Sequence, residues 1–139
     1  MNLLREEALA LTAEIKGMMS TDISANSQII LFPPFVHIAS VAQLCSDDTR
    51  IHVGAQDCSA YKQGAFTGQV SASMIRSCGA THVLIGHSER RTLCAEDDEM
   101  LSMKLDCATQ AGLIPVYCVG ESLAERENEI VHHYSERMN

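Results

Sequence analysis

Apolar runs alternate with amphipathic stretches along the whole chain. Four of the runs are short, rich in Val or Ile, and apolar on both faces, which is typical of buried parallel strands. They predict strands at Gln28–Pro33, Ile51–Gln56, His82–Gly86 and Ile114–Gly120.

Between these runs, apolar residues recur at the helical period of 3.6 residues. Glycine closes two of the patterns, at Gly79 and Gly112, where a helix commonly ends. The predicted helices are the stripe from Leu4 to Met18, Val36–Cys45, Ser71–Cys78, Glu96–Ala111 (with Leu101, Leu105 and Ala108 on its apolar face) and a last one beginning at Ser122.

One helix followed by four strand–helix units predicts an α/β fold with a parallel sheet. The pattern alone leaves two architectures open, a small doubly wound domain and part of a barrel. A complete eight-stranded barrel needs about 250 residues, so a chain of 139 residues would form about half of one.

The charge balance narrows the choice of partners. With 10 Lys and Arg against 18 Asp and Glu, the net charge is −8, which argues against binding to nucleic acid. No apolar run reaches the roughly 18 residues of a membrane span, and the N-terminal residues lack the pattern of a signal peptide. We therefore predict a cytoplasmic protein that binds neither nucleic acid nor membrane.

Six cysteines are spread along the chain, and the two nearest, Cys107 and Cys118, are eleven positions apart. This spacing contains no CxxC pair, so we expect reduced thiols and no metal site. The glycines form neither a GxGxxG motif nor a P-loop, so no nucleotide cofactor is expected.

Sites in parallel α/β proteins lie where strands end, and the most informative strand end carries His87. A helix that starts at the following residues would disfavour a positive charge on the ring. A neutral imidazole could then donate a hydrogen bond to a carbonyl oxygen. The alternative is that His87 is only a structural polar residue, with Glu89 and Arg90 as a solvated pair beside it.

Five segments, in this order and at this spacing, resemble the triosephosphate isomerase family. They are Leu31-Phe32-Pro33-Pro34-Phe35, Gly54-Ala55-Gln56-Asp57, Gly64-Ala65-Phe66-Thr67-Gly68, Ile85-Gly86-His87-Ser88-Glu89-Arg90-Arg91 and Cys118-Val119-Gly120-Glu121. The resemblance covers nearly the whole chain and weakens after about residue 128.

This resemblance implies a (β/α)8 barrel that interconverts dihydroxyacetone phosphate and glyceraldehyde 3-phosphate without a cofactor. His87 would be the electrophile, a neutral imidazole that polarises the substrate carbonyl, as is established for triosephosphate isomerases in general. Glu89 would be a carboxylate of the catalytic site that lies behind the groups in contact with substrate. Ser88 and Cys118 would support it, with Cys118 buried near the catalytic base.

The resemblance also implies a homodimer. The loop from Gln63 to Gly68 would insert into the partner subunit, where Thr67 approaches the other active site. The expected interface residues are Gln56, Phe66, Thr67, Gln69 and Arg90. Gln69 stands where the family usually has Glu, and we expect this change to weaken an ion pair with Arg90 across the dimer.

Set against the family pattern, residues 1–139 correspond to one partial barrel domain with parallel strands 2–5 and their helices. The catalytic Lys of strand 1, strands 6–8, and the Glu that acts as base would lie outside the sequence. We therefore expect this polypeptide alone to be inactive and its open sheet edges to promote association. The alternative function is that of an inactive remnant, or of a fragment that only binds a partner.

Overall fold

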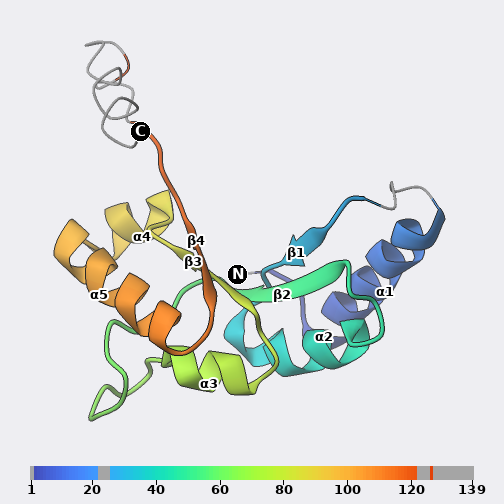
Figure 1. Ribbon diagram of the computed structural model, residues 1–139, viewed down its shortest axis with the longest axis horizontal. Coiled ribbons are helices and arrows are strands. Elements are labelled where there is room, and N and C mark those ends of the chain that lie inside the picture. The colour runs from blue at the N-terminus through green and yellow to red at the C-terminus, as the bar shows by residue number, and fades with distance from the viewer. Residues whose placement is uncertain (1, 22–25, 122–125, 127–139) are drawn as a thin grey trace.

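The computed structural model describes residues 2–21, 26–121 and 126 (Figure 1). Helices and strands alternate through most of this part of the chain. In order, the elements are α1 (Arg5–Thr21), β1 (Ile29–Leu31), the short 3-10 helix η1 (Phe35–His37), α2 (Ile38–Cys45), β2 (Ile51–Ala55), α3 (Ala72–Ser77), β3 (His82–Ile85), α4 (Ser88–Leu93), α5 (Asp98–Gln110) and β4 (Ile114–Tyr117).

The four strands form one parallel sheet in the order β1-β2-β3-β4. Gly54 of β2 pairs with His82 of β3, which in turn pairs with Ile114 of β4. Each strand therefore lies beside the next one in the sequence, as in a barrel. In a doubly wound sheet, the order in which successive strands are added reverses partway through. The predicted α/β fold is confirmed, and the order of the strands favours the partial barrel.

One face of the sheet packs against the helices and forms the core. Figure 1 shows the helices along one side of the curved sheet. The strand residues on this face alternate along β2 and β3, and apolar residues of α2, α3 and α5 cover them. Members of this core include Val53, Ala55, Val83, Ile85, Ile38, Val41, Ile75, Leu101 and Ala108.

The prediction of buried strands is correct for β2 and β3 but wrong for β1 and β4. All three residues of β1 are half-buried, and Ile114 and Tyr117 of β4 are 57% and 41% exposed. Each of these two strands has a single neighbouring strand among the described residues, so one edge of each is uncovered. No helix in the same ranges is long and apolar enough to cross a membrane.

Side-chain caps set the starts of α3 and α5. The hydroxyl of Ser71 accepts a hydrogen bond from the backbone N–H of Met74 (3.3 Å), so Ser71 is the N-cap of α3 and the helix begins one residue later than predicted. Asp97 caps α5 in the same way through Met100 (2.8 Å), so this helix begins two residues later than predicted. The helix predicted from Ser122 lies outside the described residues, apart from Arg126, which is helical.

The turn between α4 and α5 contains a strained residue, Ala95, with a φ of +52°. A left-handed conformation costs a residue with a side chain about 1–2 kcal/mol, and glycine avoids this cost. We expect Ala95→Gly to stabilise the chain by about 0.5–1 kcal/mol, since the relief exceeds the entropy that glycine adds to the unfolded chain. Urea denaturation followed by circular dichroism measures the change.

Ala13 is the matched control because it is exposed within α1 and has ordinary helical geometry. Ala13→Gly should destabilise the chain by about 1 kcal/mol. Shifts of the same sign in the two variants would contradict the assignment of strain to Ala95.

Candidate active site at the carboxyl edge of the sheet

The sequence-predicted site residues come together at one edge of the sheet. Gln56 and Asp57 follow β2, His87 follows β3 after one residue, and Cys118 follows β4 directly. Because the three strands are parallel neighbours, their carboxyl ends lie at the same edge. The structure therefore brings these residues to one edge, as strand-end reasoning expected, and their roles there remain predictions.

His87 is the N-cap residue of α4, and its ring orientation follows from one hydrogen bond. Its Nδ1 atom accepts the backbone N–H of Glu89 at 3.3 Å. A backbone N–H can only donate, so the proton of a neutral ring lies on Nε2. The side chain is 45% exposed. This arrangement leaves an N–H donor available for a carbonyl oxygen at the carboxyl edge.

Glu89 and Ser88 occupy the first turn of α4 beside this ring. The nearest carboxylate oxygen of Glu89 lies 3.8 Å from Nδ1 of His87, and its side chain is 78% exposed. Ser88 is exposed as well. Glu89 is therefore a neighbour of the imidazole on the solvent side, and its predicted role in the site remains a prediction.

Cys118 joins the site through its backbone. Its N–H donates to the carbonyl of Ile85 at 2.8 Å, which ties the end of β4 to the end of β3. The residue is half-buried, where burial was expected. The difference arises because β4 borders only β3 within the part of the chain that is described.

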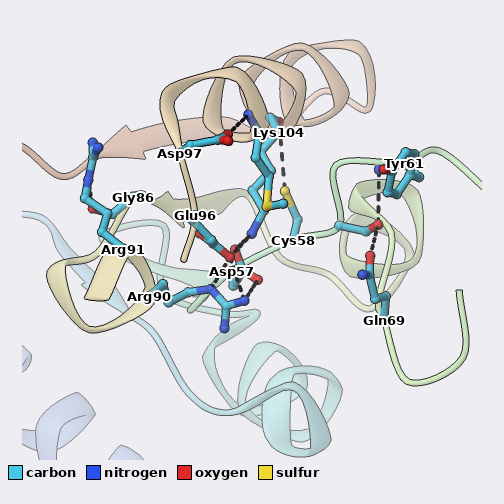
Figure 2. A network of polar contacts seen from close by, with 12 residues as sticks. Asp57, Cys58, Tyr61, Gln69, Gly86, Arg90, Arg91, Glu96, Asp97 and Lys104 are labelled. Atoms are coloured by element: carbon cyan, nitrogen blue, oxygen red, sulfur yellow. Dashed lines mark hydrogen bonds and ion pairs between the residues drawn. The ribbon is translucent and has the colours of Figure 1, made fainter. Parts of the chain in front are cut away.

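A compact group of four charged side chains lies below this edge, and we call it the charge cluster: Asp57, Arg90, Glu96 and Lys104 (Figure 2). Lys104 Nζ lies 2.5 Å from both Asp57 Oδ1 and Glu96 Oε1. The guanidinium of Arg90 approaches the same two carboxylates at 3.0 and 2.7 Å. The lysine and glutamate side chains are only 4% and 2% exposed. The cluster thus links the end of β2, α4 and α5. Lys104 and Glu96 are shielded from water, whereas Arg90 reaches the carboxylates from a side chain that is 36% exposed.

The pKa values of the two carboxylates in the charge cluster are shifted in opposite directions. Burial tends to raise the pKa of Glu96, but hydrogen bonds from Arg90 and Lys104 outweigh it, so the pKa lies below its usual value. Burial dominates at Asp57 and raises its pKa against the attraction of Lys104. The second oxygen of Glu96, Oε2, has no hydrogen-bond partner among the described residues.

The hydrophobic pattern did not reveal this cluster. Leu101, Leu105 and Ala108 were predicted to form the apolar face of the helix at 96–111, yet Lys104 lies on the same face and is buried beside Leu101 and Ala108. A lysine within an apolar stripe requires a buried partner. The position of Lys104 within the apolar stripe was therefore the sequence signal for a buried ion pair.

Three of the expected interface residues, Phe66, Thr67 and Gln69, lie on a loop that spans Ser59 to Val70 and is exposed from residue 61 to residue 69. A backbone hydrogen bond from Ser59 N–H to Val70 carbonyl (2.9 Å) closes its base. Inside the loop, the rings of Tyr61 and Phe66 stack with centroids 4.0 Å apart and planes 4° from parallel. Thr67 is exposed near the tip. The loop is therefore held in shape by its own contacts.

Three of the expected interface residues have partners within the chain. Gln69 accepts a hydrogen bond from Ser59 Oγ at 2.5 Å, and Gln56 donates one to the carbonyl of Phe32 at 2.8 Å. Arg90 is occupied by the charge cluster. The structure therefore does not bring Gln69 and Arg90 together within one chain, and a pair across a dimer stays a prediction.

No group of three or more His, Cys, Asp or Glu side chains in the described ranges is arranged to hold a metal ion. The burial of Cys58 raises the pKa of its thiol to about 12, which keeps the thiol protonated. Its Sγ donates to the carbonyl of Lys104 at 3.9 Å. Cys58 is therefore a packing residue rather than a nucleophile.

Comparison with known proteins decides the family. A sequence model of the family described as "Triosephosphate isomerase" matches residues 1–138. The chain belongs to the triosephosphate isomerase family. The triosephosphate isomerases of Amoebophilus asiaticus and Porphyromonas gingivalis (strain W83) are 42% and 44% identical to it, over 97% and 91% of the chain.

The crystal structure of triosephosphate isomerase from Bartonella henselae superposes with a TM-score of 0.82 at 33% identity and covers 93% of the chain. The match takes up 52% of that structure, and 53% and 50% of the two relatives. The chain therefore spans about half the length of the triosephosphate isomerases it matches, and its fold is part of a TIM barrel.

The charge cluster predicts that replacing Lys104 lowers the free energy of unfolding much more than replacing Lys16 does. Lys104→Met leaves two buried carboxylates with one cation, and we expect a loss of about 3–5 kcal/mol in unfolding free energy. Lys16→Met is the control, because Lys16 pairs with the exposed Asp47 and an exposed pair contributes at most about 1 kcal/mol. Urea denaturation at neutral pH compares them, and equal losses would show that the cluster does not stabilise the fold.

The opposite pKa shifts predict opposite acid responses of two variants. Because the pKa of Glu96 is lowered, it stabilises the fold above its unfolded value of 4.5, and this contribution is lost as the pH falls through the folded pKa. The pKa of Asp57 is raised, so its contribution to the stability of the fold becomes more favourable as the pH falls over the same range. Between about pH 5 and about pH 3, Glu96→Gln should flatten the loss of stability and Asp57→Asn should steepen it. Denaturant midpoints at each pH measure both slopes, and a Glu96→Gln slope as steep as that of the unaltered chain would contradict the assignment.

Proposed function

We propose that this chain supplies the electrophilic part of a triosephosphate isomerase active site, with triose phosphate as substrate. The observation that carries the proposal is the backbone hydrogen bond from Glu89 to Nδ1 of His87, which leaves the Nε2 proton available to a substrate. Membership of the family supplies the reaction. No cofactor is needed, because the chemistry is a proton transfer.

In the proposed reaction, a base removes a proton from the carbon next to the substrate carbonyl. The electrons move to the carbonyl oxygen and form an enediolate, and the proton returns to the neighbouring carbon. His87 donates its Nε2–H to the oxygen on which negative charge develops, which stabilises the transition state more than the substrate. Glu89, Ser88 and Cys118 surround the donor in this proposal.

We propose further that the 139 residues alone do not turn over triose phosphates. The family's lysine and catalytic base have no counterpart in this sequence, and general base catalysis alone contributes about 10²–10⁴-fold. The dimer is also a proposal, which the exposed, self-supporting loop from Ser59 to Val70 favours. A second candidate, a chain that binds a partner without catalysis, is favoured by the exposed Ile114 and Tyr117 on β4.

A hybrid enzyme tests the proposal directly. In it, residues 2–121 replace the matching segment of the isomerase from Amoebophilus asiaticus, which supplies the lysine and base. We expect the hybrid enzyme to interconvert the two triose phosphates and His87→Ala to lower its kcat about 10²–10³-fold, as loss of an oxyanion donor does. A coupled assay in a host without its own isomerase measures both.

His52→Gln is the control, since His52 lies within β2 away from the carboxyl edge. Its kcat should stay close to that of the unaltered hybrid enzyme. A folded hybrid enzyme without activity, or with activity that His87→Ala does not change, would overturn the proposed function and favour the binding candidate.

A further inference from the structure

Arg91, the second of two consecutive arginines after His87, spans the ends of two strands. Its Nε donates to the carbonyl of Gly86 at 2.9 Å, at the end of β3. One terminal nitrogen donates to the carbonyl of Cys118 at 3.4 Å and to the hydroxyl of Tyr117 at 3.0 Å, both at the end of β4. The same guanidinium lies over the Tyr117 ring, 5.5 Å from its centroid. A single side chain therefore fixes the carboxyl ends of β3 and β4 relative to each other.

The backbone at Gly86 is shaped to receive this guanidinium. Gly86 has a φ of +77°, and a Cβ added there would lie 2.9 Å from one terminal nitrogen of Arg91 and 3.3 Å from its Nε. Any side chain would therefore meet both an unfavourable conformation and the arginine. The peptide that leads into His87 is held by the hydrogen bond from Arg91 Nε to the Gly86 carbonyl.

The two arginines hold α4 from different sides. Figure 2 shows Arg90 reaching into the charge cluster and Arg91 lying beside Gly86. The fourth hydrogen bond of Arg91, to Asp98 at 3.2 Å, involves a carboxylate that is 92% exposed and contributes little. The contacts that matter for Arg91 are thus the two strand-end carbonyls and Tyr117.

We propose that Arg91 is a positioning residue for His87, acting through Gly86 and the end of β4. The proposal rests on the proposed function, in which His87 donates to a substrate oxygen. Arg91 fixes the peptide from which the imidazole extends, so it sets the direction of the Nε2–H bond. A misplacement of about 1 Å can cost about 10²-fold in rate, so this constraint affects catalysis without contact to the substrate.

The tautomer of His87 is the first readout, because it requires no activity. In the chain labelled with ¹⁵N-histidine, the ring nitrogens should report Nδ1 as the acceptor and Nε2 as protonated. Arg91→Met should convert this spectrum to a mixture of tautomers at neutral pH. Arg91→Lys should preserve most of the original form, since an ammonium can still reach the Gly86 carbonyl.

Kinetics in the hybrid enzyme are the second readout. Arg91→Met should lower kcat about 10–100-fold and change KM less than about 3-fold, because the hydrogen bond from His87 strengthens in the transition state. Arg91→Lys should recover part of the loss. Tyr117→Phe keeps the ring and removes only the hydroxyl acceptor, so it should give a smaller loss of kcat and remains informative if Arg91→Met does not fold.

Arg76→Met is the matched control, because Arg76 also donates to a backbone carbonyl, that of Ala80 (3.1 Å), at the opposite end of β3. It should change neither readout. A purely structural role for Arg91 would lower the stability of Arg91→Met while the tautomer and kcat stay unchanged, and this result would overturn the inference. An inactive hybrid enzyme would count against the proposed function alone, because the tautomer still decides the role of Arg91.

Discussion

The position of Lys104 between two carboxylates is the constraint on which the site depends. Its ammonium is 2.5 Å from Asp57 and from Glu96, so it joins the end of β2 to the loop before α5. Arg90 contacts the same carboxylates from α4. Because the charges of Lys104, Asp57 and Glu96 are largely withdrawn from water, they can be buried only together. The cluster therefore holds α4, through Arg90, against the end of β2 and the start of α5, and His87 is the residue that caps this helix.

The sequence predicted much of the fold, since apolar runs mark strands and glycines mark helix ends. The starts of β2 and β3 were predicted correctly, while β4 ends at Tyr117 although its apolar run continues to Gly120. Periodicity cannot report the burial of edge strands, because burial depends on which strands pair. For this reason the half-buried β1 and exposed Ile114 differed from expectation.

Prediction of the site was less complete. The location of His87 after β3 followed from strand-end reasoning, but its tautomer depends on a single contact with Glu89 N–H. The charge cluster requires residues that lie 47 positions apart, Asp57 and Lys104, to meet. The bracing of Gly86 by Arg91 likewise depends on packing between α4 and two strands. Such long-range contacts leave little trace in local sequence patterns.

The loop from Ser59 to Val70 has a consequence for molecular association. Its closed base and the stacked rings of Tyr61 and Phe66 order the loop while it is still exposed to solvent. A surface that is ordered before it meets a partner loses little conformational entropy on binding. Any complex that this loop forms should therefore show fast, nearly rigid-body association, with a smaller entropic penalty than a loop that must fold as it binds.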